Sequence, residues 1–232
     1  MSIKPDTAMI MAAGLGTRMR PLTLTTPKPL IKVADKALID YGFEKIKAAG
    51  VARVVVNKYY LPDQIEVWAK NHHAITSDES DAVLETGGGI LRALPLLGDK
   101  PFYVLNSDCF WIENGVPALL RLAQNWDDNK MDCMLLLCDP KNTTNYSGGG
   151  DFIIAPDGEL VRQNQNAFVY IGAYIVHPRL FVGAPSGKFS MNVLWNKAIA
   201  SGRLFGIEHR GHWFDVGTPE GIPAAEARLK LG

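Results

Sequence analysis

Short apolar runs alternate with helix-like segments along almost the whole chain. Thr7–Ala12 has the pattern of a buried strand, and apolar residues then recur at helical spacing from Leu38 to Ile46. The same alternation continues to a final helical segment over Pro219–Leu229. Strand–helix–strand runs with short connections pack as a mostly parallel sheet with helices on both faces. The sequence therefore predicts an α/β fold of three layers around a mixed, mainly parallel sheet.

The other elements follow from the same patterns. A hairpin is expected over Phe152–Arg162, because Pro156-Asp157-Gly158 lies between two apolar arms. This hairpin interrupts the strand–helix alternation, and we therefore expect the sheet to be mixed in that region. Further strands are expected over Val51–Asn57, Ile75–Ser77, Phe102–Asn106, Met131–Cys138, Ala167–Val176 and Arg203–Glu208, and helices over 61–71, 89–97, 116–126 and 191–200.

Composition excludes several classes of protein. The 232 residues include 24 Lys and Arg and 24 Asp and Glu, so the basic excess typical of a nucleic-acid-binding protein is absent. With 47% hydrophobic residues the chain can bury a core, which argues against disorder. The longest uncharged stretch, Gln163–Pro178, contains two Gln and two Asn, so no membrane span is expected. The three cysteines indicate a reducing compartment, and we expect a cytoplasmic protein without nucleic-acid or membrane partners.

The loop after the first strand carries glycines and cations. It contains Gly14 and Gly16, then Arg18, with Lys28 ten residues further on. The dinucleotide-binding pattern fails because Met19 stands where a third glycine is needed, and the Walker pattern does not occur. Glycines let backbone N–H groups approach an anion closely, and two nearby cations suit a di- or triphosphate. The loop therefore predicts a polyphosphate site.

The longer segment Ala12–Leu30 resembles the signature of the sugar-1-phosphate nucleotidyltransferases, A-A-G-x-G-T-R-x-x-P-L-T-x-x-x-P-K-P-L. The resemblance implies a Rossmann-like nucleotidyltransferase fold and an enzyme that makes an NDP-sugar and pyrophosphate from an NTP and a sugar-1-phosphate. It implies that Ala12, Ala13, Gly14, Gly16 and Thr17 bind the nucleotide and that Arg18 and Lys28 are catalytic.

Two aspartates follow apolar segments that are far apart in the sequence. Asp108 comes directly after the strand pattern ending at Asn106, and Asp215 lies in Trp213-Phe214-Asp215-Val216-Gly217. Both match metal-binding positions of the family that the chain resembles. Mg²⁺ prefers oxygen ligands and is commonly held by one or two carboxylates together with substrate phosphates. We therefore expect Asp108 and Asp215 to bind Mg²⁺.

A second glycine-rich segment, Leu84-Glu85-Thr86-Gly87-Gly88-Gly89, is expected as a loop before a helix. It resembles the base-binding loop of the family, which implies nucleotide contacts from Thr86, Gly87 and Gly88. Glu79 is a further candidate, because a carboxylate accepts a hydrogen bond from either uracil or guanine. These residues alone do not decide between UTP and GTP.

Two stretches most resemble one subfamily, the N-acetylmuramate-1-phosphate uridylyltransferases of cell-wall recycling: Leu84–Ile90 and His209–Thr218. The resemblance implies UTP and N-acetylmuramate-1-phosphate as substrates. It also implies that Asn106, Asp151 and Gly172 contact the sugar. The Glu-Lys-Pro segment that many relatives carry is absent between Gly158 and Gly172. Because these residues decide neither the base nor the sugar, a guanylyltransferase acting on mannose- or heptose-1-phosphate is the alternative substrate assignment.

Two other classes of protein stay open at this point. A glycosyltransferase would carry an Asp-x-Asp metal motif, of which Asn106-Ser107-Asp108 is only half, and a non-catalytic nucleotide-sugar sensor could keep the same fold. We expect one catalytic domain over residues 1–232, with nucleotide-binding residues before about 110 and sugar-binding residues after it.

Overall fold

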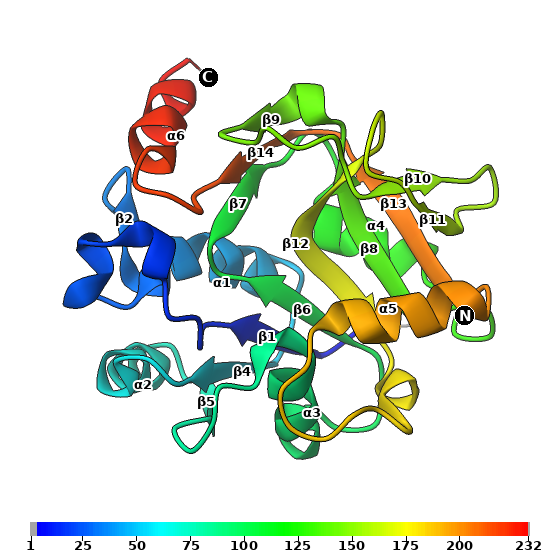
Figure 1. Cartoon of the computed structure of the whole chain (residues 1–232), viewed down its shortest axis with the longest axis horizontal. Helices are drawn as coiled ribbons and strands as arrows, with labels where there is room; N and C mark the ends of the chain where they lie inside the picture. The colour runs from blue at the N-terminus through cyan, green and yellow to red at the C-terminus, as the bar shows by residue number, and fades with distance from the viewer. Residues whose placement is uncertain (1–3, 232) are drawn as a thin grey trace.

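A seven-stranded sheet runs through the centre of the molecule in the computed structural model, which describes residues 4–231 (Figure 1). Of its strands, β12 is antiparallel to both neighbours, while the other neighbouring pairs are parallel. The predicted mixed, mainly parallel sheet is therefore confirmed. The strands, in order across the sheet, are β13 (Leu204–His209), β8 (Cys133–Cys138), β12 (Val169–Val176), β6 (Phe102–Asn106), β1 (Thr7–Met11), β4 (Arg53–Lys58) and β5 (Ile75–Asp78).

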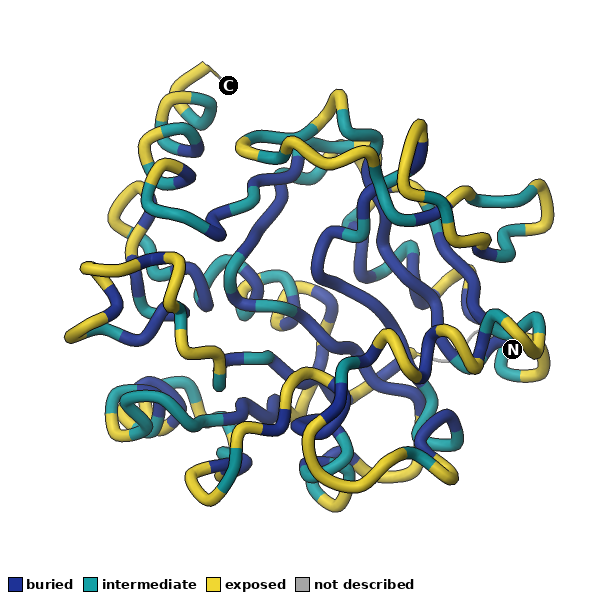
Figure 2. Tube along the Cα trace, in the orientation of Figure 1, coloured by how far each residue is buried: buried dark blue, intermediate teal, exposed yellow. Residues whose placement is uncertain are grey.

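Helices cover both faces of this sheet. Alternate residues of β1 point to opposite faces, so Ala8 and Ile10 join one hydrophobic cluster and Met9 joins the other. The first cluster packs against α1 (Leu38–Ala48), α2 (Pro62–Asn71) and α4 (Ala118–Asn125). The second packs against α3 (Glu85–Leu97) and α5 (Met191–Ala200). Figure 2 shows the buried strands enclosed by partly exposed helices and loops, which confirms the three layers.

A small second sheet lies beyond the carboxyl end of β6. It consists of β7 (Cys109–Ile112), β14 (His212–Asp215) and β9 (Thr143–Thr144), and Figure 1 shows it close to the C-terminal helix α6 (Gly221–Leu229). The sequence did not predict β7 or β14. The predicted hairpin is present as β10 (Phe152–Ile154) and β11 (Leu160–Arg162), and another short hairpin pairs β2 (Lys32–Val33) with β3 (Lys36–Ala37).

A third hydrophobic cluster joins the glycine loop to this second sheet. Met19 of the loop is fully buried together with Phe110 of β7 and Phe214 of β14. The rings of Phe110 and Phe214 stack with centroids 4.6 Å apart, and Tyr41 of α1 stacks on Phe110 at 4.1 Å. Aromatic stacking adds to the stabilisation from burying these large side chains. The cluster therefore fixes the loop relative to both aspartate-bearing segments. Within residues 4–231, no helix is both long and apolar enough to cross a bilayer.

His209, at the end of β13, is buried with 1% of its surface exposed. Its Nε2 atom lies 3.0 Å from the carbonyl oxygen of Ile112. Burial lowers the pKa of His209 to about 4, against partial compensation by the negative charge of Glu113. The imidazole is therefore neutral in the folded protein at pH values where the unfolded chain protonates it.

We predict that His209 makes the protein less stable as the pH falls from about 6.5 towards 4. In that interval the unfolded chain binds more protons than the folded protein, so the free energy of unfolding decreases, by up to about 3 kcal/mol for this group. Urea denaturation at about pH 7.5 and about pH 5, comparing the wild-type protein with His209→Gln, measures this contribution. His73→Gln, at an exposed position, is the control. An identical pH dependence in the wild-type and His209→Gln proteins would contradict the prediction.

Candidate functional site

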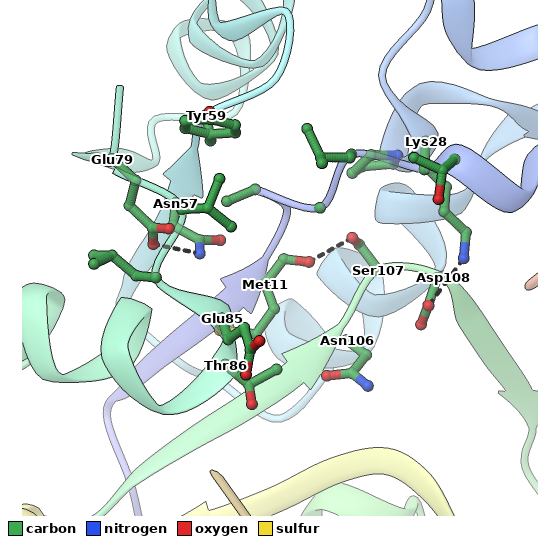
Figure 3. Close-up of a pocket in the computed structure, with 18 of the residues that line it drawn as sticks. Met11, Lys28, Asn57, Tyr59, Glu79, Glu85, Thr86, Asn106, Ser107 and Asp108 are labelled. Carbon is green, nitrogen blue, oxygen red and sulfur yellow. Dashed lines mark hydrogen bonds and ion pairs between the residues drawn. The ribbon is translucent and has the colours of Figure 1, made fainter. Parts of the chain in front are cut away.

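A cleft of about 390 Å³ opens at the carboxyl ends of β1, β4 and β6 (Figure 3). Its lining includes the predicted residues Ala13, Gly14, Gly16, Thr17, Arg18, Lys28, Glu79, Thr86, Asn106 and Asp108. Ligands of open α/β sheets usually bind at this edge of the sheet. The cleft is therefore the candidate site.

Side chains from the two neighbouring strands fix the point where the glycine loop leaves β1. The backbone ladder between β1 and β4 extends to Ile10 and Val56, and the Asn57 side chain continues it by accepting from the Ala12 N–H at 2.6 Å. On the other side, the Ser107 hydroxyl donates to the Met11 carbonyl oxygen at 2.6 Å. These bonds satisfy backbone groups that would otherwise be buried without partners.

Gly14 and Gly16 differ in the physical reason why glycine occupies the position. Gly16 has φ +61°, and a Cβ there would lie 2.8 Å from Thr23 Cγ2 and 3.1 Å from Lys28 Cβ. The Gly16 carbonyl also accepts from the Thr23 hydroxyl at 2.8 Å, so the turn is packed from within. A Cβ at Gly14 would meet no atom within 4 Å. Gly14 therefore borders the open cleft, where it leaves room for a ligand.

Both cations of the loop lie close to the aspartate-bearing segments. Lys28 begins a short helical turn, Lys28–Leu30, and its Nζ lies 2.9 Å from Asp108 Oδ2. The residue is only 8% exposed, so this ammonium group is held in place. Arg18 is exposed, with its guanidinium beside Gly217, where a Cβ would lie 3.4 Å from Nη1. The loop therefore presents two positive charges at one end of the cleft.

The second sheet brings Asp108 and Asp215 together. Antiparallel pairing of β7 and β14 sets Asp215 opposite Cys109, and the Val216 N–H donates to the Asp108 carbonyl oxygen at 3.1 Å. Asp215 Oδ1 accepts from the Gly217 N–H at 2.9 Å. Burial raises the pKa of Asp215, and the negative charge of Asp108 raises it further. A bound cation would relieve this repulsion and favour the ionised form of Asp215.

The donor set fits a hard divalent cation. In residues 4–231 no group of three His, Cys, Asp or Glu side chains is placed to hold a metal ion, so the three or four protein ligands typical of zinc are not provided. Two carboxylates close to a loop with two cations match the usual Mg²⁺ arrangement, in which substrate phosphates and water complete the coordination.

A buried carboxylate lies on the other side of the cleft. Glu79 is 2% exposed, and its Oε1 accepts from Asn57 Nδ2 at 2.7 Å (Figure 3). Burial raises the pKa of Glu79, while the hydrogen bond from Asn57 acts in the opposite direction. The cleft thus has Arg18, Lys28 and Asp108 on one side and the buried carboxylate of Glu79 on the other, whereas the predicted metal ligand Asp215 is not among its lining residues.

A family model described as nucleotidyl transferase matches residues 7–230. The chain belongs to this family. It is 42% identical to N-acetylmuramate alpha-1-phosphate uridylyltransferase of Caulobacter vibrioides, over 99% of both chains. A relative of the same name from Neisseria meningitidis serogroup B is 35% identical, over 95% of this chain and 96% of that one. UDP-glucose pyrophosphorylase, solved with UDP-glucose, has the same fold, with a TM-score of 0.77 at 20% identity over 97% of this chain and 99% of that one. The predicted family and its fold are therefore confirmed.

One local prediction about this nucleotidyltransferase was wrong. Gly87 and Gly88 were expected in a loop before the helix, but α3 begins at Glu85 and they lie in its first turn. Their N–H groups donate to the Phe189 carbonyl oxygen at 2.9 and 3.1 Å, and a Cβ at Gly88 would lie 2.2 Å from the Gly187 carbonyl oxygen. The two glycines thus seat the segment 187–191 against α3. Their amides are therefore already bonded within the protein.

Thr86 contacts the segment 187–191 and also lines the cleft. Its hydroxyl accepts from the Met191 N–H at 2.9 Å, and the residue lines the cleft. Glu85 also lines the cleft, with φ +59°, which is an unfavourable backbone conformation for a residue with a side chain. Such strain is often found at functional sites.

Of the three residues expected to contact the sugar, one lines the cleft and two do not. Asn106 ends β6 and lines the cleft. Gly172 has φ +81° and lies at an irregularity of β12, where a Cβ would come 2.5 Å from Cys109 Sγ. Asp151 Oδ2 accepts from the Tyr170 N–H at 2.9 Å, which gives that carboxylate a structural role. Gly172 and Asp151 are not among the cleft-lining residues, so their contact with a sugar stays a prediction.

Several cleft residues were not predicted. Asn57, Tyr59, Glu85, Ser107 and Gly217 line the cleft beside the predicted residues. The signal for Asn57 was present, because it is the polar residue that ends a run of valines next to the glycine-loop strand. Glu85 and Gly217 gave no such signal, because their positions depend on contacts between distant parts of the chain.

We predict that Gly88→Ala lowers the free energy of unfolding by about 1–3 kcal/mol, because the added methyl group collides with the Gly187 carbonyl. The sign is diagnostic, since Gly→Ala inside a helix usually stabilises by up to about 1 kcal/mol. Gly42→Ala in α1 is the matched control, because a Cβ there would make an ordinary 3.4 Å contact with Leu105 Cδ2. Urea denaturation of the three proteins measures the difference. Equal stabilities for Gly88→Ala and Gly42→Ala would rule out the collision.

Proposed function

We propose that this nucleotidyltransferase transfers UMP from UTP to N-acetylmuramate-1-phosphate and releases pyrophosphate. The observation that carries the proposal is the distribution of groups across the cleft. Arg18, Lys28 and Asp108 line one side, where Asp215 accepts from the N–H of the lining residue Gly217, and the buried Glu79 lies on the other. The cations suit the triphosphate at one end of a nucleotide, and the carboxylate suits an N–H donor of the base at the other end. The identity to uridylyltransferases over nearly the whole chain supports the choice of substrates.

The reaction exchanges one phosphorus–oxygen bond for another. A phosphate oxygen of the sugar phosphate attacks the α-phosphorus of UTP, and the bond from that phosphorus to the bridging oxygen of the leaving pyrophosphate breaks. The attacking phosphate is already anionic near neutral pH, so no general base is required. Catalysis then depends on alignment and on stabilisation of charge. We assign Lys28 to the α-phosphate and Arg18 to the departing pyrophosphate.

Asp108 and Asp215 would hold Mg²⁺ in this scheme. A bound Mg²⁺ supplies positive charge that screens the phosphates of both substrates from each other. Lys28, paired with Asp108 at 2.9 Å, is positioned to bind a phosphate oxygen beside that site. The backbone N–H groups of residues 13–17 are assigned to the β- and γ-phosphates. The cytoplasmic location of the enzyme stays a prediction.

The proposal is tested by measuring pyrophosphate release with UTP, GTP, CTP and dTTP, each combined with a panel of sugar-1-phosphates. We expect the highest kcat/KM with UTP and N-acetylmuramate-1-phosphate. Preference for GTP with mannose- or heptose-1-phosphate would replace the assignment with a guanylyltransferase. Nucleotide binding without pyrophosphate release from any pair would refute the catalytic proposal.

Lys28→Ala is expected to lower kcat about 10²–10³-fold, because a preorganised charge facing the reacting phosphate is lost. Lys36→Ala, which removes a partly exposed lysine paired with Glu44, is the control for loss of a surface charge. Pyrophosphate release under saturating UTP measures kcat, and circular dichroism verifies the fold. A folded Lys28→Ala protein with wild-type turnover would defeat the assignment of this lysine.

Asp215→Asn is expected to raise the Mg²⁺ concentration that gives half-maximal activity by at least about tenfold, because one of two anionic ligands becomes neutral. The same protein should be at least as stable as wild type without metal, since the substitution removes a repulsive charge beside Asp108. Magnesium titrations of activity and metal-free urea denaturation measure the two effects. An unchanged magnesium requirement would exclude Asp215 as a ligand.

A further inference from the structure

The buried hydrogen bonds between Ala12, Asn57 and Glu79 have a polarity that the backbone determines. The Ala12 N–H can only donate, so the Asn57 atom that faces it at 2.6 Å must be the carbonyl oxygen Oδ1. The amide Nδ2 is then left to donate to Glu79 Oε1 at 2.7 Å. Asn57 is 1% exposed and Glu79 is 2% exposed, so water does not compete freely for these bonds. The orientation of both side chains therefore follows from one backbone donor.

This chain of bonds ends on a free acceptor. In the part of the chain that the structure describes, no hydrogen bond reaches the second carboxylate oxygen of Glu79, Oε2. Glu79 lines the cleft, as does Asn57. Movement is restricted, because a Cβ at Gly89 would already lie 2.6 Å from Glu79 Oε1. Glu79 thus presents a fixed hydrogen-bond acceptor to whatever base occupies the cleft.

We propose that Asn57 is the positioning residue for base selection: it holds Glu79 as an acceptor and thereby selects uracil over cytosine. The inference rests on the proposed function, since it names the basis of the UTP preference. Uracil has an N–H donor at N3, whereas cytosine has an unprotonated N3 acceptor that would face the acceptor of Glu79. Guanine also presents N–H donors on this edge, so the contact does not separate UTP from GTP.

The experiment replaces the hydrogen-bond acceptor that residue 79 presents to the base by a donor. In Glu79→Gln, the introduced amide accepts from Asn57 through its oxygen and turns its NH₂ donor towards the base. That donor suits cytosine N3 and clashes with uracil N3–H. We expect the ratio of kcat/KM for UTP to kcat/KM for CTP to fall roughly 10–100-fold, the range for one hydrogen bond to a charged group.

The second variant restores the original polarity. When Asn57→Asp is added to Glu79→Gln, the introduced aspartate accepts from both the Ala12 N–H and the introduced amide NH₂. The oxygen of the introduced glutamine then faces the base, and the UTP:CTP ratio should return to within a few-fold of wild type. Asn57→Asp alone places two carboxylates in buried contact, so we expect a higher KM for UTP. A structural role for Asn57 would not produce this reciprocal rescue.

The ratio is measured on one protein sample at a time, so a reduced folded fraction cancels. The combined exposed substitutions Asn125→Asp and Glu44→Gln are the control and should leave the ratio unchanged. An unchanged ratio in Glu79→Gln, or a ratio that stays low in the double variant, overturns the inference. Failure of the proposed function is distinguishable, because the wild-type enzyme would then either prefer GTP with mannose- or heptose-1-phosphate or release no pyrophosphate with any pair. Calorimetric affinities for UTP and CTP would still test the selection in all four proteins.

Discussion

The antiparallel pairing of β7 with β14 is the constraint on which the rest of the site depends. It joins segments that follow Asp108 and precede Val216, and the Val216 N–H closes the pair on the Asp108 carbonyl. The stacked rings of Phe110 and Phe214 hold the two strands in register from the buried side. Because Met19 packs into the same cluster, the cationic loop cannot move independently of the carboxylates. One hydrophobic cluster thereby fixes the relative positions of the charges to which we assign roles in catalysis.

The fold was largely predictable from the sequence because its central strands are long apolar runs. The strand predicted over Phe102–Asn106 has the bounds of β6, and the one predicted over Val51–Asn57 lies within two residues of β4, since burial on both faces leaves a strong signal. In contrast, β7 and β14 are short strands that pair with each other across about a hundred residues, so no local pattern such as a hairpin turn identifies them. Their pairing is accompanied by stacking of Phe110 on Phe214, two residues that lie far apart in the sequence.

The candidate site was predictable where its residues act through their own chemistry and not where they act through tertiary packing. Arg18, Lys28, Asp108 and Glu79 were identified as candidates and do line the cleft. Gly87 and Gly88 were wrongly predicted as loop residues, because a glycine that lets another segment pack closely has the same sequence pattern as one that lets a ligand approach. Only the three-dimensional structure distinguishes these two uses of glycine. The division of the chain into nucleotide- and sugar-binding parts near residue 110 stays a prediction.

The two ends of the proposed nucleotide site share one rigid connection. Asn57 bonds both to Ala12, where the phosphate loop leaves β1, and to Glu79 beyond β5. A shift of the loop would therefore break or strain the bond that orients the acceptor for the base. In the proposed complex, base recognition and phosphate alignment would then be coupled without a conformational change, because three adjacent strand ends hold both groups in place. Such preorganisation reduces the entropy lost when a nucleotide binds and favours a single reactive alignment of its α-phosphate.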